Sequence, residues 1–157
     1  MRRLALLLVL LAMPGCYPAT TRPDIEPVPG ASRIEVELFV PAATRALAVA
    51  LDADSIPVSR TEPEDGWLET PWFDVTTMRP TTRRPIGLEV VKVRAFVTPG
   101  RPNWSVIDVE TVYRPVADPS ALGRDLDRQV PVGHPAAVRV KAVLDSLVRE
   151  YGEEPGS

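Results

Sequence analysis

The sequence has very few of the residues from which many functional sites are built. Among 157 residues there is one cysteine, Cys16, and one histidine, His134. A single cysteine cannot form a disulfide within the chain, and a metal site made of several Cys and His ligands is excluded by count. A Ser-His-Asp triad would have to use His134, but no Ser-plus-acid motif accompanies it. We therefore interpret His134 as a capping or loop residue before a helix that begins at Pro135.

The chain also lacks runs of basic residues. The formal net charge is -3, and removing a leader that carries Arg2 and Arg3 leaves 16 basic against 21 acidic residues. Binding of a phosphate backbone needs a basic face, so nucleic acid is not an expected partner. No glycine-rich phosphate loop or metal-ligand spacing is present either, and the sequence gives no reason to expect a cofactor.

Length and composition fit one ordinary folded domain. Hydrophobic residues make up 45% of the chain and charged residues 25%, which is typical of globular proteins. The 18 prolines fall mostly between the periodic segments and mark their boundaries.

The first 15 residues have the pattern of an export signal. Two arginines precede an apolar run, Leu4–Ala12, that is too short to span a bilayer. The run is followed by Met-Pro-Gly and then Cys16, which resembles the lipobox of bacterial lipoproteins. The resemblance implies that residues 1–15 are removed and that Cys16 is the lipid attachment site and the mature N-terminus. Tyr17, rather than Asp, follows it, which by resemblance to lipoprotein sorting in Gram-negative bacteria favours the outer membrane, with the domain on the periplasmic face.

An ordinary secretory signal, in which Cys16 has no role, is the alternative. In either case the next segment, up to residue 32, is rich in proline and small polar residues and has no apolar period. We interpret residues 16–32 as an extended tether, residues 33–152 as a single domain and residues 153–157 as a loose tail.

Apolar periodicity divides the first half of the domain into short elements. The expected elements are a strand at Arg33–Val40, a helix that Pro41 opens and Asp54 ends, a strand at Ile56–Thr61, a hairpin turn at Glu62–Gly66, and an aromatic strand at Trp67–Val75.

The second half contains the clearest strand pair, Ile86–Val97 with Asn103–Tyr113. If the paired residue numbers sum to about 202, Lys92 lies opposite Glu110 and Arg94 opposite Asp108. We interpret these four charges as a solvated face. A catalytic carboxylate pair, Asp108 with Glu110, is the less favoured alternative because each acid already has a basic partner.

A loop at Thr77–Pro85 and a long connector at Arg114–Gly133, with a helical turn at Ser120–Leu126, complete the chain before the last helix. That helix carries an apolar stripe that ends at Tyr151, and Gly152 ends it. The order β-α-β-β-β-β-α predicts an α+β fold: an antiparallel sheet with both helices on one face, as in helix-grip domains.

Four segments resemble the repeat unit of BamC (NlpB)-type outer-membrane lipoproteins. They are Phe39-Val-Pro41, Ala46–Leu51, Ile56-Pro-Val58 and Asp65-Gly-Trp-Leu-Glu-Thr-Pro-Trp-Phe73. The resemblance implies a helix-grip domain and an accessory role in the machinery that assembles outer-membrane proteins. It covers only about residues 34–74, and the chain has one such domain where BamC has two.

Aromatic residues are the candidates for partner binding: Trp67, Trp72, Phe73 and Trp104. Trp67 and Trp72 have opposite parity on one expected strand, so they share a face only if Pro71 marks a bulge. An exposed Trp would be a suitable anchor for a protein partner. Core packing with one incidental surface Trp is the alternative.

Two functions are compatible with these features. The first is a non-catalytic, membrane-anchored envelope lipoprotein with a protein-binding or structural role, with envelope or barrel-assembly proteins as partners. The alternative is a periplasmic carrier of a small molecule or lipid, which predicts a dry groove lined by Val140, Leu144 and the strand valines. An enzyme is the least favoured class.

Overall fold

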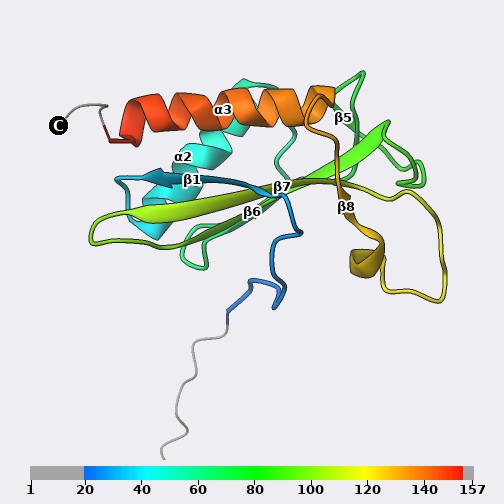
Figure 1. Cartoon of the computed structure of the whole chain (residues 1–157), viewed down its shortest axis with the longest axis horizontal. Coiled ribbons are helices and arrows are strands. Elements are labelled where there is room, and N and C mark those ends of the chain that lie inside the picture. Colours follow the sequence, from blue (N-terminus) through cyan, green and yellow to red (C-terminus); the bar gives the residue numbers. More distant parts are fainter. Residues whose placement is uncertain (1–19, 154–157) are drawn as a thin grey trace, which may run out of the picture.

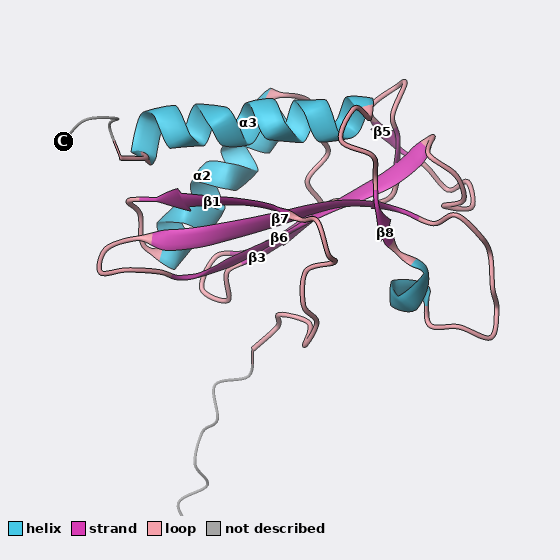
Figure 2. Ribbon diagram, viewed as in Figure 1, coloured by secondary structure: helices cyan, strands magenta, loops and turns pink. Residues whose placement is uncertain are grey.

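Two long antiparallel strands form the centre of the fold, β6 (Val90–Pro99) and β7 (Ser105–Tyr113). The computed structural model describes residues 20–153. It has an α+β architecture in which an antiparallel sheet of eight strands carries two helices, α2 (Val40–Ala53) and α3 (Pro135–Tyr151), on one face (Figures 1 and 2). The predicted fold class is therefore confirmed.

The other elements extend this central hairpin on both sides. They are β1 (Ser32–Val36), β2 (Arg60–Glu62), β3 (Trp67–Glu69), β4 (Phe73–Asp74), β5 (Arg79–Pro80), a 3-10 turn, η2 (Gly123–Leu126), and β8 (Arg128–Gln129). The strand order is β1-β7-β6-β3-β2, with β4 also on β6, β5 on β4, and β8 also on β7.

The core lies between the sheet and the two helices. One face of β6 and β7 is apolar because alternate residues point to the same side of a strand. These residues pack against the apolar stripes of α2 and α3, the two helices that lie over this face of the sheet (Figure 1). The central members, each at most 5% exposed, are Ala43, Leu47, Leu51, Phe73, Val91, Val93, Ala95, Val97, Ile107, Val109, Val140, Val143, Leu144 and Leu147.

Both helices carry the indicated proline at their start: α3 begins at Pro135, and α2 begins one residue before Pro41. Pro41 and Pro135 lie in the first turns, where a missing N–H costs no hydrogen bond. Thr44 of α2 is polar but fully buried. Its hydroxyl donates to the carbonyl of Val40 at 2.8 Å, so the helix itself satisfies the buried polar group.

Several predicted boundaries are corrected. The first strand ends at Val36 rather than Val40, because Phe39 already caps α2. Ile56 is buried in the core but lies outside any strand, and β2 begins only at Arg60. The expected loop and connector each contribute a short strand, β5 and β8, whose two-residue pairings leave no readable period.

The aromatic strand is interrupted as Pro71 suggested. Glu69 pairs with Arg94 and Phe73 with Val91, so four steps on one strand oppose three on the other. The extra residue is a bulge, in which the hydroxyl of Thr70 accepts a hydrogen bond from the backbone N–H of Val93 at 2.9 Å. Leu68 and Phe73, of opposite parity, therefore both reach the core.

The register of the central hairpin differs from the predicted one by two residues. Arg94 pairs with Glu110, and Lys92 faces Val112. The turn causes this shift: the backbone N–H of Trp104 bonds the carbonyl of Arg101, with Pro102 and a left-handed Asn103 (φ 68°) between them. This is the residue pattern of a type II turn. A two-residue shift keeps every side chain on its predicted face.

The conformation of Asn103 provides a test of this turn. We expect Asn103→Val to lower the free energy of unfolding by about 1–2 kcal/mol, because a β-branched residue is strained at positive φ. Asn103→Gly is the matched control and should be neutral or stabilising, since glycine has no such strain. Urea unfolding of both variants measures the difference. Equal losses in the two variants would contradict the assigned turn.

Candidate functional site

The second face of the sheet, opposite the helices, is charged but not solvated. Arg94, Asp108 and Glu110 are only 7%, 8% and 0% exposed, so the expectation of a solvated charged face is wrong. Figure 1 shows the reason: the N-terminal segment and η2 lie below the sheet, on the side away from α2 and α3. Charges that a bare sheet would expose to water are therefore covered.

A buried ion-pair cluster occupies the centre of this face. Its members are Arg94, Glu110, Arg114, Arg124 and Asp127. Arg94 joins both acids, with Nη1 2.6 Å from an oxygen of Glu110 and Nη2 2.6 Å from an oxygen of Asp127. Arg114 Nε donates to Asp127 at 2.8 Å, and Arg124 Nη1 donates to Glu110 at 2.5 Å. The cluster thus ties the connector to the central strands.

The cluster also holds the N-terminal segment. The backbone N–H of Val28 donates to Glu110 at 2.8 Å, and Arg124 donates to the carbonyl of Glu26. Both carboxylates have several charged or N–H donors, which is what allows them to be buried as ions. Burial alone would lower the pKa of Arg94, but hydrogen bonds to Asp127 and Glu110 raise the pKa above its ordinary value, so the guanidinium stays charged.

This cluster bears on the carboxylate-pair alternative. Asp108 is bonded by Arg33, with Nε at 2.8 Å and Nη2 at 3.0 Å. Glu110 is fully buried and already accepts from two arginines and a backbone amide. Asp108 lines a shallow surface pocket together with Arg33, but both acids are already engaged by arginines, so they act in holding segments onto the sheet.

The four aromatic candidates do not form one patch. Phe73 lies in the core between the sheet and the helices, and Trp67 is 1% exposed. Trp72 and Trp104 are half-buried, but Trp72 lies beside Lys92 and Arg114, whereas Trp104 lies in the β6–β7 turn under Arg101. They therefore occupy opposite ends of the central hairpin.

Trp67 is buried on the charged face rather than in the main core. Its ring meets that of Phe96 edge to face, with centroids 5.0 Å apart, and the guanidinium of Arg22 lies 5.3 Å above the Phe96 ring. The indole Nε1 of Trp67 has no hydrogen-bond partner among residues 20–153. Trp67 therefore contributes to a small second core that the N-terminal segment closes.

His134 has the capping role that the sequence indicated. Its Nδ1 accepts from the backbone N–H of Ala136 at 3.3 Å, and its Nε2 lies 2.9 Å from the carbonyl of Leu88. The ring thereby joins the start of α3 to the loop before β6.

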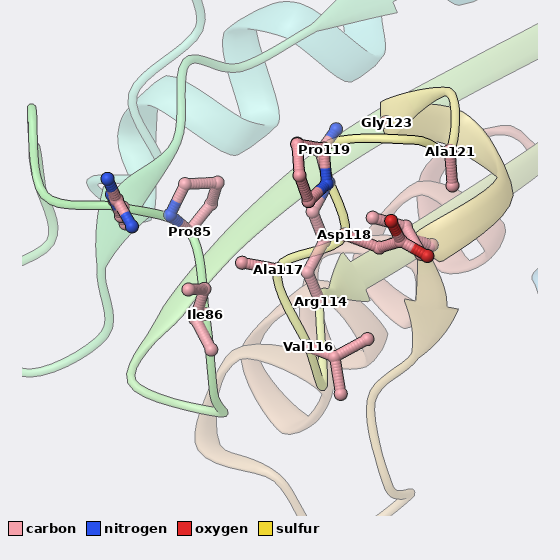
Figure 3. Close-up of a pocket in the computed structure, with 11 residues that line it drawn as sticks. Pro85, Ile86, Arg114, Val116, Ala117, Asp118, Pro119, Ala121 and Gly123 are labelled. Atoms are coloured by element: carbon pink, nitrogen blue, oxygen red, sulfur yellow. The ribbon is translucent and has the colours of Figure 1, made fainter.

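A surface pocket of about 530 Å³ lies where the connector faces the loop before β6. Figure 3 shows Pro85 and Ile86 on one segment, across from Val116 and Ala117 on the other. Arg84 and Arg114 also line it. Sequence reasoning did not identify this connector pocket, and its only signal was the isolated apolar residues within a proline-rich connector.

Two further predictions concern the membrane and metals. Cys16, the expected lipid attachment site, lies outside the described residues, as does the expected signal segment. Within residues 20–153, no helix has the length and apolar character needed to cross a bilayer, and no three His, Cys, Asp or Glu side chains are grouped so that they could hold a metal ion.

A comparison with models of known protein families finds none that matches this chain, and a comparison with curated proteins finds no significant match. The resemblance to BamC-type lipoproteins therefore stays a prediction from the quoted segments.

The cluster predicts a large cost for removing one acid. We expect Glu110→Gln to lower the free energy of unfolding by about 3 kcal/mol or more, because it leaves buried arginines without a full complement of charge. Glu64→Gln is the matched control: Glu64 pairs with Arg45 on the surface, and its loss should cost less than about 0.5 kcal/mol. Chemical denaturation measures both, and similar small effects would show that the cluster contributes little.

Asp65 predicts a pH-dependent attachment of the N-terminal segment. Hydrogen bonds from the backbone N–H and then the hydroxyl of Thr21 lower the pKa of Asp65 below its ordinary value of 3.8. Because the folded-state pKa is depressed, the attachment is at full strength above pH 3.8 and is lost as the pH falls through the lower, folded value. The NMR chemical shift of the Thr21 amide, followed as the pH is lowered, should change with a midpoint below pH 3.8. This transition should be absent in Asp65→Ala. A midpoint above 3.8 would contradict this arrangement.

Proposed function

We propose that this chain is a non-catalytic lipoprotein of the bacterial outer membrane whose single domain binds other envelope proteins. The observation that carries the proposal is the position of Cys16, the only cysteine, directly after a short apolar run and a small residue. The partner class is taken from the BamC-like segments and includes proteins of barrel assembly.

The arrangement of the domain supports a binding role. Trp72 and Trp104 each keep part of the ring accessible and each lies against a guanidinium. Aromatic and arginine side chains are the residues most enriched at the energetic centres of protein interfaces. Several large apolar side chains are also exposed, among them Phe39 at 67% and Leu122 at 75%.

The carrier alternative has less support. The residues that it requires to line a groove, Val140, Leu144 and the strand valines, are at most 2% exposed and pack against one another in the core. The connector pocket lies elsewhere, on the surface and away from the interface between α3 and the sheet.

Crosslinking in the native cells tests the proposal. We expect the wild-type protein to fractionate with the outer membrane and to yield crosslinks to envelope proteins after membranes are solubilised. Cys16→Ser is the matched control, and it should move the protein out of the membrane fraction because the thiol is the lipid acceptor. Mass spectrometry identifies the crosslinked partners.

Two outcomes would overturn the proposal. If Cys16→Ser leaves both the mass of the mature protein and its membrane fraction unchanged, Cys16 is not the anchor. If the anchored protein yields lipid but no protein partner, the carrier function is favoured instead.

A further inference from the structure

We propose that the connector pocket binds the C-terminal carboxylate of a partner polypeptide, with the apolar side chain of its last residue seated between Ile86 and Val116. The inference rests on the proposed protein-binding function and specifies the chemistry that the partner presents. Its basis is a pocket lining that combines two arginines, called here the cationic rim, with apolar walls, on two segments that belong to different parts of the chain.

Arg84 supplies the first cation of the rim. It lines the pocket and is exposed, and its side chain has no ion pair or hydrogen bond with any described residue. The other arginines of the domain that lie near acids are paired, as Arg83 is with Asp74 and Glu89. Arg84 therefore keeps its full set of donors for an anion.

Arg114 supplies the second cation and is held in place from behind. Its Nε donates to the buried Asp127 at 2.8 Å, and its guanidinium carbon lies 5.0 Å from the centre of the Trp72 ring. The lack of a side chain at Gly123 makes room for it, since a Cβ there would lie 2.5 Å from Nη2. Only Nε is used within the described structure, so the terminal nitrogens are positioned but available.

The one acid in the lining, Asp118, does not neutralise the rim. Its carboxylate accepts from the backbone N–H of Ser120 at 2.9 Å and from the Ser120 hydroxyl at 2.6 Å. The carboxylate is therefore already engaged within its own turn. With Arg84 and Arg114 against Asp118, the lining has one positive charge in excess. Asp127, which pairs with Arg114 from behind, is shared by three arginines of the cluster and does not line the pocket.

The walls select the rest of the ligand. Ile86 and Val116 are 39% and 54% exposed, so they present apolar surface to the solvent rather than to the core. A volume of about 530 Å³ is in the range of pockets that hold small ligands. A terminal residue with one aliphatic side chain fits such half-open walls, whereas a long acyl chain would keep much of its surface in water.

Fluorescence anisotropy with a labelled peptide tests the site. The purified mature protein is reconstituted into phosphatidylcholine vesicles, and the probe is the peptide Gly-Ser-Gly-Ser-Leu with fluorescein at its N-terminus. We expect saturable binding of the free-acid peptide and at least about tenfold weaker binding of the same peptide with a C-terminal amide, because the amide loses charge-assisted hydrogen bonds.

Surface variants locate the binding. Arg84→Gln should weaken the free-acid peptide about tenfold while leaving the amide peptide unchanged. Val116→Asp should weaken binding of the free-acid peptide as well. Both positions are exposed, so we expect both variants to fold. Arg79→Gln is the matched control, since Arg79 is exposed on β5 and does not line the pocket.

Three results would overturn the inference: equal affinities for acid and amide, equal losses in Arg79→Gln and Arg84→Gln, or binding of dodecanoate without binding of the peptide. The two proposals fail separately. If Arg84→Gln captures partners in cells as well as the wild type does, the protein-binding function stands and the proposed carboxylate site is wrong. If the purified protein binds the peptide but no partner is captured in cells, the carboxylate site stands and the proposed envelope function is wrong.

Discussion

Arg94 is the side chain on which the second face of this protein depends. A guanidinium at the middle of a central strand would ordinarily point into water. Here it bridges two fully buried carboxylates, one on the neighbouring strand and one on the connector. That bridge allows segments with little apolar content to cover the sheet, because charge pairing replaces the hydrophobic packing that holds the helices on the other side. The domain thus has two differently built layers around one sheet.

The same arrangement links the surface to the interior. Arg114 belongs to the buried cluster through Nε and to the connector pocket through its terminal nitrogens. A side chain that is fixed on one edge by a buried acid loses little further freedom when it binds on the other. One cation of the rim is therefore rigidly held even though the walls of the pocket come from connecting segments.

Sequence patterns predicted the parts of the fold that local physics determines. Pro41, Pro135 and Gly152 mark helix ends through effects that act within one turn, and alternation placed residues 91–97 and 105–111 on the correct faces of β6 and β7. The predicted register was wrong because it was chosen to align opposite charges across the two strands. The actual register is set by the turn, which depends on the left-handed backbone at Asn103. A short strand such as β8 has too few residues to show a period.

The candidate site could not be predicted for a different reason. Whether Glu110 is solvated depends on Val28 and Arg124, which lie on segments without apolar periodicity. Nothing around Arg94 or Glu110 indicates that a second layer exists. The aromatic residues were similarly informative about strand and bulge, since Pro71 marked the break, but not about which of the two covered faces each ring would occupy.

The attachment of Thr21 and Arg22 to the sheet has a consequence for reach. A free tether of 17 residues, from Cys16 to Ser32, would let the domain range up to about 60 Å from a lipid at Cys16, at roughly 3.5 Å per residue. If Cys16 carries the proposed lipid, the fastening of the chain at Thr21 leaves only residues 16–20 as a tether, which limits its reach to about 17 Å. A domain on so short a tether would stay close to the membrane surface, and any partner would have to present its binding segment within that distance of the bilayer.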